Sequence, residues 1–415
     1  MRADVAVIGG GAAGMMAAVT AAERGLSVTL LEPGERLGRK LRITGKGRCN
    51  VTNNCGVKEF LESVPTNPKF LYSSVTAFPP RAAMDFFENR LGVPLKTERG
   101  GRVFPVSDDA NDIAGALVRR LRELGVRHVR GRALAVETDD AGAVRAVTTD
   151  RGEVSCRAAV LCTGGLSYPA TGSTGDGWAI AAALGHGIVP PRASLVPLES
   201  PAGYCAELAG FAPRNVDLTV LEDGKAIFTE RGEMLFAHFG VTGPLVLSAS
   251  AHMRRWGERT YALSIDFKPA LSAQKLDERI LRDFEKYRNR DMANALTDLA
   301  PRSLIPVALR LAEIPPQTKV HDMTRARRQA LGAVLKAFPV PVSGPRPVAE
   351  AIVTGGGVDV KQIDPRTMQS KLVPGLYLAG ELLDVDAYTG GFNLQIAWAT
   401  GRCAGLAVGK DKRDE

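Results

Sequence analysis

Three glycines near the start of the chain, Gly9, Gly11 and Gly14, have the G-x-G-x-x-G spacing of a turn that accepts a pyrophosphate. In such a turn the first glycine permits the bend, the second lets phosphates approach the backbone, and the third lets a helix pack on a strand. Ala12 and Ala13 complete the turn with small side chains. This pattern predicts a dinucleotide bound at the N-terminus of a helix.

The residues around this turn have the pattern of one β-α-β unit. Residues 4–8 form a short apolar run typical of a buried strand, and the Ala- and Met-rich segment after the glycines ends at Gly25. Residues 26–31 predict a second strand, which ends in Glu32 before Pro33. The Glu32 carboxylate is placed to accept hydrogen bonds from an adenosine ribose. Strand, turn, helix and terminal acid together indicate a dinucleotide more strongly than the glycines alone.

Two later segments repeat the pattern of an apolar strand that runs into glycines, at residues 160–165 and 375–381. With the first turn, they resemble the cofactor-binding segments of FAD proteins of the glutathione-reductase superfamily. The resemblance implies that Glu381 lies near the ribityl chain and pyrophosphate, and that the last helix directs its first N–H groups at the flavin ring. It assigns to FAD the residues Thr163, Gly164, Gly165, Gly380, Glu381, Gly391, Phe392, Asn393 and Leu394.

Another segment, residues 38–53, reads Gly-Arg-Lys-Leu-Arg-Ile-Thr-Gly-Lys-Gly-Arg-Cys-Asn-Val-Thr-Asn. It closely resembles a signature of the BaiN-like family of bacterial NAD(P)/FAD-dependent oxidoreductases, which includes proteins described as aminoacetone oxidases. Ala387 and Phe392 stand where we expect the family to have Gly and Tyr. The resemblance extends over nearly the whole chain, with further matches in residues 163–177, 238–244, 354–358 and 380–393.

The family resemblance implies that the basic segment brings positive charge and hydrogen-bond donors to the pyrophosphate and the isoalloxazine ring. Asn50 is the residue expected to hydrogen-bond the ring. The alternative is an exposed basic loop, and it fits Lys46 best because a lysine charge is mobile and easily solvated. The residues concerned are Arg39, Lys40, Gly45, Lys46, Arg48 and Asn50.

The same resemblance implies an α/β fold, in which a Rossmann-like FAD-binding domain is assembled from both chain ends around an inserted β-rich domain and a small helical subdomain. The residue pattern agrees, since alternation at residues 216–220 predicts a strand and Asp223-Gly224 a hairpin. After Ser272, a predicted N-cap, apolar residues recur every four positions as in a helix. Residues 339–347, rich in proline, are predicted to be a linker. The predicted boundaries are 1–190 and 346–415 for the FAD-binding domain, 191–270 for the β-rich domain and 271–345 for the helical subdomain.

The composition of the 415 residues is that of a folded protein, with 45% hydrophobic and 24% charged residues. The net charge of +8 could attract nucleic acid, but the basic residues form no stripe interleaved with aromatic residues, so the sequence argues against that partner. No apolar run reaches the roughly 18–20 residues of a membrane-spanning helix. Six cysteines without a Cys-x-x-Cys pair predict reduced thiols and a cytoplasmic location. Neither they nor the five histidines have the spacing of a metal site.

The sequence thus predicts an FAD-dependent oxidoreductase that moves hydride or electrons between flavin and a small organic substrate. Because no second glycine turn forms a separate nicotinamide domain, NAD(P)H is expected as a transient co-substrate. The alternative is that the substrate reduces the flavin and oxygen accepts the electrons. Residues 174–177 are similar to the fumarate-reductase branch, which implies hydride transfer from flavin to an activated carbon–carbon double bond. The sequence gives neither the substrate nor the oligomeric state.

Reduction of such a double bond needs a proton donor on the opposite face of the substrate. Arg48, Tyr168 and His238 are the candidates. Phe236 and Phe239 flank His238, so the pattern favours a buried histidine over a catalytic one. The ring of Tyr168 could equally serve packing.

Other functions stay open at this stage. Cys49 and Cys55 lie where a disulfide reductase has its redox pair, but they enclose five residues instead of that superfamily's four. A flavoprotein with an RNA-linked or non-catalytic binding role is a second alternative, with Arg325, Arg327 and Arg328 as the RNA-binding face. The spacing of these arginines predicts, more simply, the solvated start of a helix.

Overall fold

The computed structural model describes residues 1–409, and the contacts between residues divide the chain into two units. The first unit combines Met1–Ser194 with the chain from Val348 onward, and the second unit is Leu195–Pro347. The α/β class, with a Rossmann-type sheet built from both parts of the first unit, is confirmed. Each unit has its own hydrophobic core.

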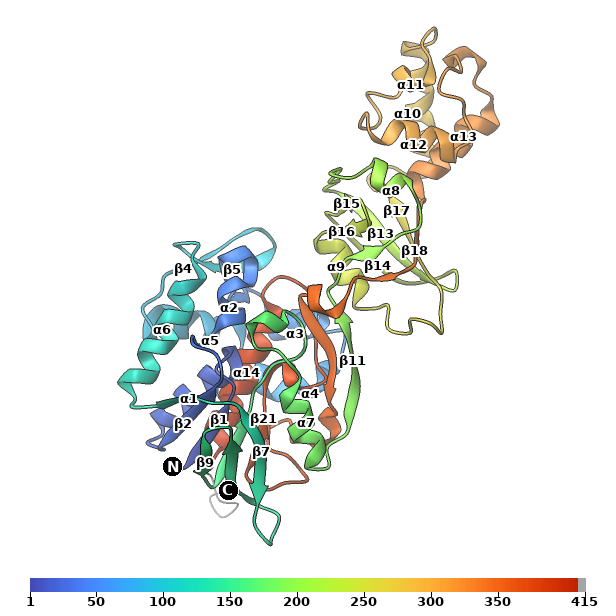
Figure 1. The fold of residues 1–415 in the computed structure, drawn as a ribbon. Helices are drawn as coiled ribbons and strands as arrows, with labels where there is room; N and C mark the ends of the chain where they lie inside the picture. Colours follow the sequence, from blue (N-terminus) through green and yellow to red (C-terminus); the bar gives the residue numbers. More distant parts are fainter. Residues whose placement is uncertain (410–415) are drawn as a thin grey trace. The chain divides into compact units, whose positions relative to one another are not determined.

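The first unit is organised around a five-stranded parallel sheet (Figure 1). Three of its strands are buried throughout, which explains why they read as continuous apolar runs. Because parallel strands end at the same edge, the turns after these strands meet there. In spatial order the strands are β21 (Leu376–Leu378), β10 (Ala158–Leu161), β1 (Val5–Ile8), β2 (Val28–Glu32) and β6 (Arg127–Arg130).

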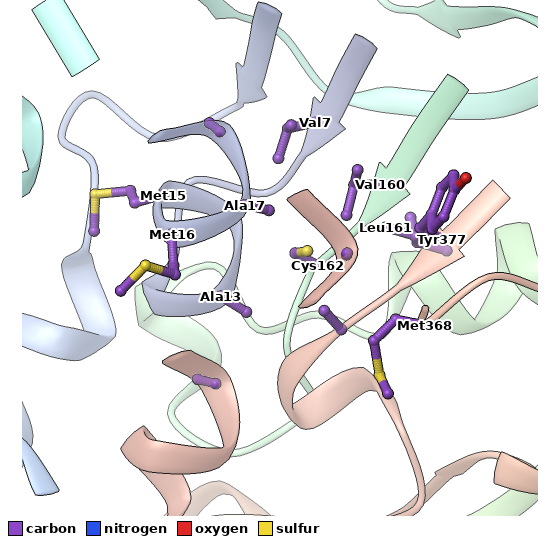
Figure 2. Packing of buried hydrophobic residues seen from close by; sticks show 14 of the residues in the cluster. Val7, Ala13, Met15, Met16, Ala17, Val160, Leu161, Cys162, Met368 and Tyr377 are labelled. Atoms are coloured by element: carbon purple, nitrogen blue, oxygen red, sulfur yellow. The ribbon is translucent and has the colours of Figure 1, made fainter. Parts of the chain in front are cut away.

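Helix α1 (Ala12–Glu23) packs against helix α14 (Phe392–Ala407), and glycines let the two helices approach closely. A Cβ atom on Gly401 would lie 2.3 Å from the carbonyl oxygen of Ala13. One on Gly405 would lie 2.6 Å from the carbonyl oxygen of Ala17. Figure 2 shows the buried side chains of α1 beside those of the parallel strands. The close packing is possible only because α14 has a stripe of small residues.

Shorter elements extend the first unit. Its other helices are α2 (Arg39–Ile43), α3 (Val57–Glu62), α4 (Pro68–Ala77), α5 (Pro80–Asp85), α6 (Ala110–Glu123) and α7 (Asp176–Ala183). One antiparallel sheet contains β3 (Thr52–Asn53), β5 (Arg102–Pro105) and β4 (Leu95–Thr97). Another contains β7 (Ala133–Thr138), β8 (Val144–Thr149) and β9 (Gly152–Ser155).

A separate antiparallel pair in the first unit joins β11 (Ile188–Ser194) to β20 (Val353–Val358). The register shifts at Pro190-Pro191, since proline donates no N–H group to a ladder. On the facing strand a Cβ atom at Gly356 would lie 2.4 Å from the carbonyl oxygen of Pro190. Glycine is therefore needed where β20 meets the irregular part of β11.

The second unit contains two four-stranded sheets and a set of helices (Figure 1). The predicted hairpin is confirmed, because Asp223 (φ 49°) and Gly224 (φ 79°) both adopt the left-handed conformation that a two-residue hairpin turn requires. One sheet has the order β14 (Lys225–Gly232), β13 (Val216–Glu222), β17 (Tyr261–Asp266) and β18 (Phe338–Val342). The other has the order β15 (Leu235–Ala237), β16 (Gly240–Thr242), β12 (Leu198–Glu199) and β19 (Gly344–Pro345).

The prediction that residues 339–347 are a linker is wrong. Strand β18 pairs with β17 at the edge of its sheet, and β19 lies at the edge of the other. Within β18 the buried Phe338 and Val340 alternate with the exposed Pro339 and Pro341. Proline is tolerated there because one side of an edge strand has no neighbour to receive N–H donors.

The helical part of the second unit begins where the sequence predicts. The Ser272 side chain accepts a hydrogen bond from the Lys275 N–H at 3.2 Å and so caps α10 (Ala273–Lys286). At the start of α13 (Arg325–Lys336), Arg325 and Arg327 are exposed, while Arg328 pairs with Asp277 at 2.7 Å. The other helices of this unit are α8 (Tyr204–Glu207), α9 (Pro244–Ser250), α11 (Met292–Ala295) and α12 (Leu304–Leu311).

Candidate active site

The first glycine turn connects β1 to α1, and its three glycines have three different surroundings. A Cβ atom on Gly9 would lie 2.4 Å from the carbonyl oxygen of Cys162, and Gly9 itself has φ of +104°. A Cβ atom on Gly14 would lie 1.9 Å from the Gly9 carbonyl oxygen. A Cβ atom on Gly11 would meet no atom of the described residues within 4 Å. The turn is thus packed against protein on two sides and open at Gly11, where α1 begins with Ala12.

Glu32 lies at the end of β2, and the backbone holds its carboxylate beside this turn. Oε2 accepts a hydrogen bond from the Gly10 N–H at 2.8 Å, and Oε1 accepts one from the Gly34 N–H at 2.8 Å. These two bonds fix the carboxylate while each oxygen retains a lone pair for a ribose hydroxyl. The geometry therefore agrees with the predicted role of Glu32, which stays a prediction.

Lys40 and Glu381 form the electrostatic centre of the site. Lys40 Nζ lies 2.6 Å from Glu381 Oε2 and 2.6 Å from the Ser167 hydroxyl. Glu381 Oε1 accepts bonds from the Ser167 hydroxyl at 3.0 Å and from the Thr354 N–H at 2.9 Å. Burial acts to raise the pKa of Glu381, but the charge and hydrogen bond of Lys40, with these donors, outweigh it and hold the pKa below its ordinary value. Glu381 is therefore a fixed carboxylate.

The turn after β10 touches the same centre. A Cβ atom on Gly165 would lie 2.5 Å from the Thr354 hydroxyl oxygen. In the separate turn after β21, a Cβ atom on Gly380 would lie 2.8 Å from the Ala13 Cβ. Gly164 has φ of +75°. The hydroxyl oxygen of Thr163 is buried and has no hydrogen-bond partner among residues 1–409. A buried polar group of this kind is a ready donor or acceptor for a ligand.

The start of α14 is built by contacts from distant parts of the first unit. A Cβ atom on Gly391 would lie 2.3 Å from the Thr52 carbonyl oxygen, so glycine is required there. With its amide oxygen toward α14, Asn50 accepts a hydrogen bond from the Gly391 N–H at 2.9 Å. The Asn393 side chain binds both the N–H and the carbonyl of Ala387, at 2.9 and 2.7 Å. Asn50 and Asn393 thus fix the chain on both sides of the helix start.

The remaining predicted cofactor residues have the following places. Phe392 is buried with its ring centroid 5.5 Å from that of Phe60, and Leu394 packs partly buried against the core. Arg39 donates a hydrogen bond to the Ala170 carbonyl at 2.5 Å. Gly45 and Lys46 are exposed, and both have positive φ. Lys46 therefore lies in a solvent-exposed loop, as the alternative prediction for this residue has it.

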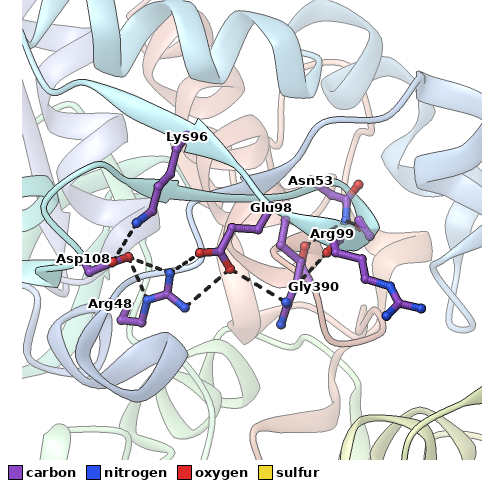
Figure 3. A network of polar contacts seen from close by, with 9 residues as sticks. Arg48, Asn53, Lys96, Glu98, Arg99, Asp108 and Gly390 are labelled. Atoms are coloured by element: carbon purple, nitrogen blue, oxygen red, sulfur yellow. Dashed lines mark hydrogen bonds and ion pairs between the residues drawn. The ribbon is translucent and has the colours of Figure 1, made fainter. Parts of the chain in front are cut away.

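Arg48, a predicted cofactor and catalytic residue, already has several partners (Figure 3). It donates to Asp108 Oδ1 at 2.6 Å and forms an ion pair with Glu98. Its guanidinium carbon lies 4.1 Å from the centroid of the Phe104 ring. Lys96 binds the other oxygen of Asp108 at 2.6 Å. Arg48 is thus held in an ion-pair network, and its catalytic role stays a prediction.

The other two proton-donor candidates lie in different units. Tyr168, in the first unit, has φ of 53°, and its carbonyl accepts a bond from the Thr171 hydroxyl at 2.7 Å. His238 belongs to the second unit and is exposed, so the expectation that it is a buried histidine is wrong. Of the two flanking phenylalanines, Phe239 meets its ring edge-on, with centroids 5.1 Å apart, whereas Phe236 is buried in the core. The catalytic roles of Tyr168 and His238 stay predictions.

Burial keeps the thiols of Cys49 and Cys55, the candidate redox pair, protonated. All six cysteines are free. Burial raises the pKa of Cys49 to about 12 and the pKa of Cys55 to about 11. Because the thiolate is the reactive species, these thiols are poorly suited to disulfide exchange at neutral pH.

A polar cluster that the sequence did not predict lies on β11 and on the chain between Glu381 and α14. Arg192 and Asp386 form an ion pair at 3.8 Å, and Asp386 Oδ2 accepts a hydrogen bond from the Ser194 hydroxyl at 2.6 Å. The Asn67 amide donates to Asp384 Oδ2 at 3.0 Å. The sequence signal that could have found it is the Asp-x-Asp spacing at residues 384–386, within the segment 380–393 that resembles the family.

Comparison with known proteins places this geometry in a family. A model described as the HI0933-like protein Rossmann domain matches residues 3–407. The chain belongs to this family. The family is one of FAD-dependent Rossmann proteins, which confirms the predicted resemblance and the class of FAD-dependent oxidoreductase. In the described part of the chain no helix is both long and apolar enough to span a membrane.

Two curated relatives match nearly the whole chain at similar identity. The 3-dehydro-bile acid delta(4,6)-reductase of Clostridium scindens is 30% identical over 97% of this chain and 98% of its own. The ribosomal RNA dihydrouridine synthase of Escherichia coli is 31% identical over 96% of both chains. Among solved structures, 3-ketosteroid-delta4-(5alpha)-dehydrogenase from Rhodococcus jostii has a TM-score of 0.51 at 18% identity, covering 99% of this chain and 97% of that one. At that identity the structural likeness shows a shared fold.

Proposed function

We propose that this protein is an FAD-dependent reductase that saturates a carbon–carbon double bond conjugated to a carbonyl group, with NAD(P)H as the hydride donor. The names of the two relatives support this reaction class. One names a steroid ketone and the other a uracil ring, and in each the double bond that is reduced is conjugated to a carbonyl. The shared chemistry is the function that both names support.

The observation that carries the proposal is the open backbone at Gly11. Every other glycine of the turn is packed against protein, whereas at Gly11 there is space at the N-terminus of α1, the position where N–H groups and the helix dipole bind a pyrophosphate. The unpartnered hydroxyl of Thr163 lies after the neighbouring strand. These features fit FAD, which supplies the ring that accepts and transfers hydride when it is bound.

The residues of the chain would then divide the work of binding. Glu32 would accept hydrogen bonds from the ribose, and the first turn of α1 would bind the pyrophosphate. Lys40 and Glu381, with opposite charges 2.6 Å apart, would present a nearly neutral wall beside the ribityl chain. The start of α14, fixed by Asn50, would direct N–H groups at the ring edge on which negative charge develops.

The central test is an anaerobic titration of the purified, FAD-loaded protein with NADH and with NADPH. We expect one nicotinamide to bleach the flavin absorbance. The reduced protein should then be reoxidised by a 4,6-dien-3-one steroid or by uridine-containing ribosomal RNA, at least about 10-fold faster than by buffer alone. The reduced carbon–carbon bond is then identified in the product by mass spectrometry.

Three results would contradict the proposal. Absence of flavin absorbance after incubation with FAD would contradict FAD binding. A bleached flavin that neither compound reoxidises would contradict the reduction of a conjugated double bond. A flavin that no nicotinamide bleaches but that an amine bleaches would indicate an oxidase instead.

RNA is a second candidate substrate class, supported by the name of the Escherichia coli relative and by the exposed Arg325 and Arg327. If RNA binds this helix start, the double variant Arg325→Gln/Arg327→Gln should bind ribosomal RNA more weakly. The slope of log affinity against log salt should fall in magnitude by roughly 1–2. The matched control is Lys58→Gln, an exposed residue of the first unit, which should leave the slope unchanged. Equal slopes for all three proteins would exclude this face as an RNA contact.

A further inference from the structure

Arg192 has hydrogen-bond donors that no described residue accepts. Its side chain is 23% exposed, and its guanidinium lies flat over Gly355, where a Cβ atom would come within 3.1 Å. Among residues 1–409 its ion pair is with Asp386, at 3.8 Å, beyond hydrogen-bond distance, and its charge also acts on Asp384. An arginine has five N–H donors, so most of them are available to a ligand.

Two carboxylates behind Arg192 also have unused atoms. Asp386 is fully buried, and Asp384 is 9% exposed. In each, Oδ1 is buried and accepts no hydrogen bond from any described residue. Two carboxylates and one guanidinium leave an excess negative charge in a buried place, which a single proton would neutralise. Burial raises the pKa of Asp384, and the nearby Asp386 adds to this, against the Arg192 charge, the Asn67 amide and the Gly356 N–H.

This cluster borders the residues that would hold the cofactor. Gly355, under the guanidinium, follows Thr354, whose N–H binds Glu381. Asp386 precedes Ala387, which Asn393 clamps to the first turn of α14. Gly355, which packs against Arg192, and Asp386 are therefore each adjacent in sequence to a residue that contacts Glu381 or Asn393.

We propose that Arg192 binds the carbonyl oxygen of the substrate, and that Asp386 and Asp384 are positioning residues that hold the guanidinium. The inference rests on the proposed function. In that reaction NAD(P)H is oxidised and supplies the hydride that reaches one carbon of the double bond. The π electrons move toward the carbonyl and form an enolate, and a proton, replaced from solvent, completes the other carbon. Arg192 would stabilise the enolate oxygen, where negative charge develops.

The test uses FAD-loaded protein and a probe that needs no turnover. The phenolate of 4-hydroxybenzaldehyde carries its charge on an oxygen like that of an enolate, and its stacking on a flavin is seen as a long-wavelength absorbance band. We expect Arg192→Gln to weaken phenolate binding by roughly 10- to 100-fold, and Arg192→Lys to weaken it less. The control is Arg145→Gln, which removes an equally long 3.8 Å ion pair, with Glu153, but on an exposed surface. Arg145→Gln should bind the probe as the unchanged protein does.

A loss of folding in Arg192→Gln would be understandable, since it leaves a buried carboxylate without its cation. The double variant Arg192→Gln/Asp386→Asn removes both charges and should fold and hold FAD. Phenolate binding by this double variant as tight as that of the unchanged protein would overturn the proposal. A folded, FAD-loaded double variant that no longer binds the phenolate would support the proposal.

The positioning carboxylates need a readout that a packing role would not change. We expect Asp384→Asn to keep FAD and the probe but to remove one apparent pKa from the pH profile of kcat/KM. An unchanged profile would overturn the role of Asp384. Because the probe binds without turnover, the binding results for the Arg192 variants are independent of whether the unchanged protein reduces the steroid or the RNA. The pH profile of Asp384→Asn is measured with whichever substrate the unchanged protein reduces.

Discussion

Gly14→Ala is expected to destabilise the apoprotein strongly, while Gly11→Ala is expected to leave its stability nearly unchanged. The new Cβ at position 14 would lie 1.9 Å from the Gly9 carbonyl oxygen, which is backbone and cannot rotate away. The helix and the turn must separate, at an expected cost of about 3 kcal/mol or more. Thermal unfolding of the apoprotein should show a midpoint lowered by roughly 6–12 °C.

Position 11 gives the matched control for the same chemical change. Gly11 has φ of −80°, which alanine adopts without strain, and its Cβ would point into open space. The apoprotein should therefore keep its stability within about 0.5 kcal/mol. FAD affinity, measured by fluorescence titration, should nevertheless fall by roughly 100-fold or more, because the added methyl would occupy the approach of the pyrophosphate. Unaltered FAD affinity in Gly11→Ala would show that the pyrophosphate lies elsewhere.

The difference between these two glycines also shows what sequence alone can give. Their spacing predicts a phosphate-binding turn, because the pattern depends on neighbouring residues and on local backbone geometry. The hairpin at Asp223-Gly224 and the cap at Ser272 were predictable for the same reason. In each case the physical cause lies within a few residues of its effect.

Features that depend on distant residues were not predictable in this way. Lys40 meets Glu381 across 341 residues of sequence, and Ser194 and Arg192 meet Asp386 across roughly 190 residues. One sequence gives the charges but not which charges become neighbours. The linker prediction for residues 339–347 failed on a related point, since prolines typical of a loop are also compatible with an edge strand.

Lys40→Met is expected to destabilise the protein by about 2 kcal/mol at pH 7, less than a fully buried pair would cost, because the two side chains are 23% and 18% exposed. The sign of the pH dependence of the unfolding free energy identifies the cause of this destabilisation. In the unchanged protein the folded-state pKa of Glu381 lies below 4.5, so its contribution is present above pH 4.5 and is lost as the pH falls through the folded pKa. Without Lys40, burial is expected to raise that pKa, and stability should instead fall as the pH rises above 4.5.

Denaturant unfolding between pH 3.5 and 8 should therefore show opposite slopes for the two proteins, with the deficit of Lys40→Met largest at neutral pH. Lys58→Met, which removes an exposed ion pair with Glu62 at 4.0 Å, is the control and should cost less than about 0.5 kcal/mol. Adding Glu381→Gln to Lys40→Met should recover part of the loss, because it removes the uncompensated charge. A deficit that is constant with pH would instead assign the effect to packing of the lysine stem, and Glu381 would then not be the carboxylate that Lys40 holds ionised.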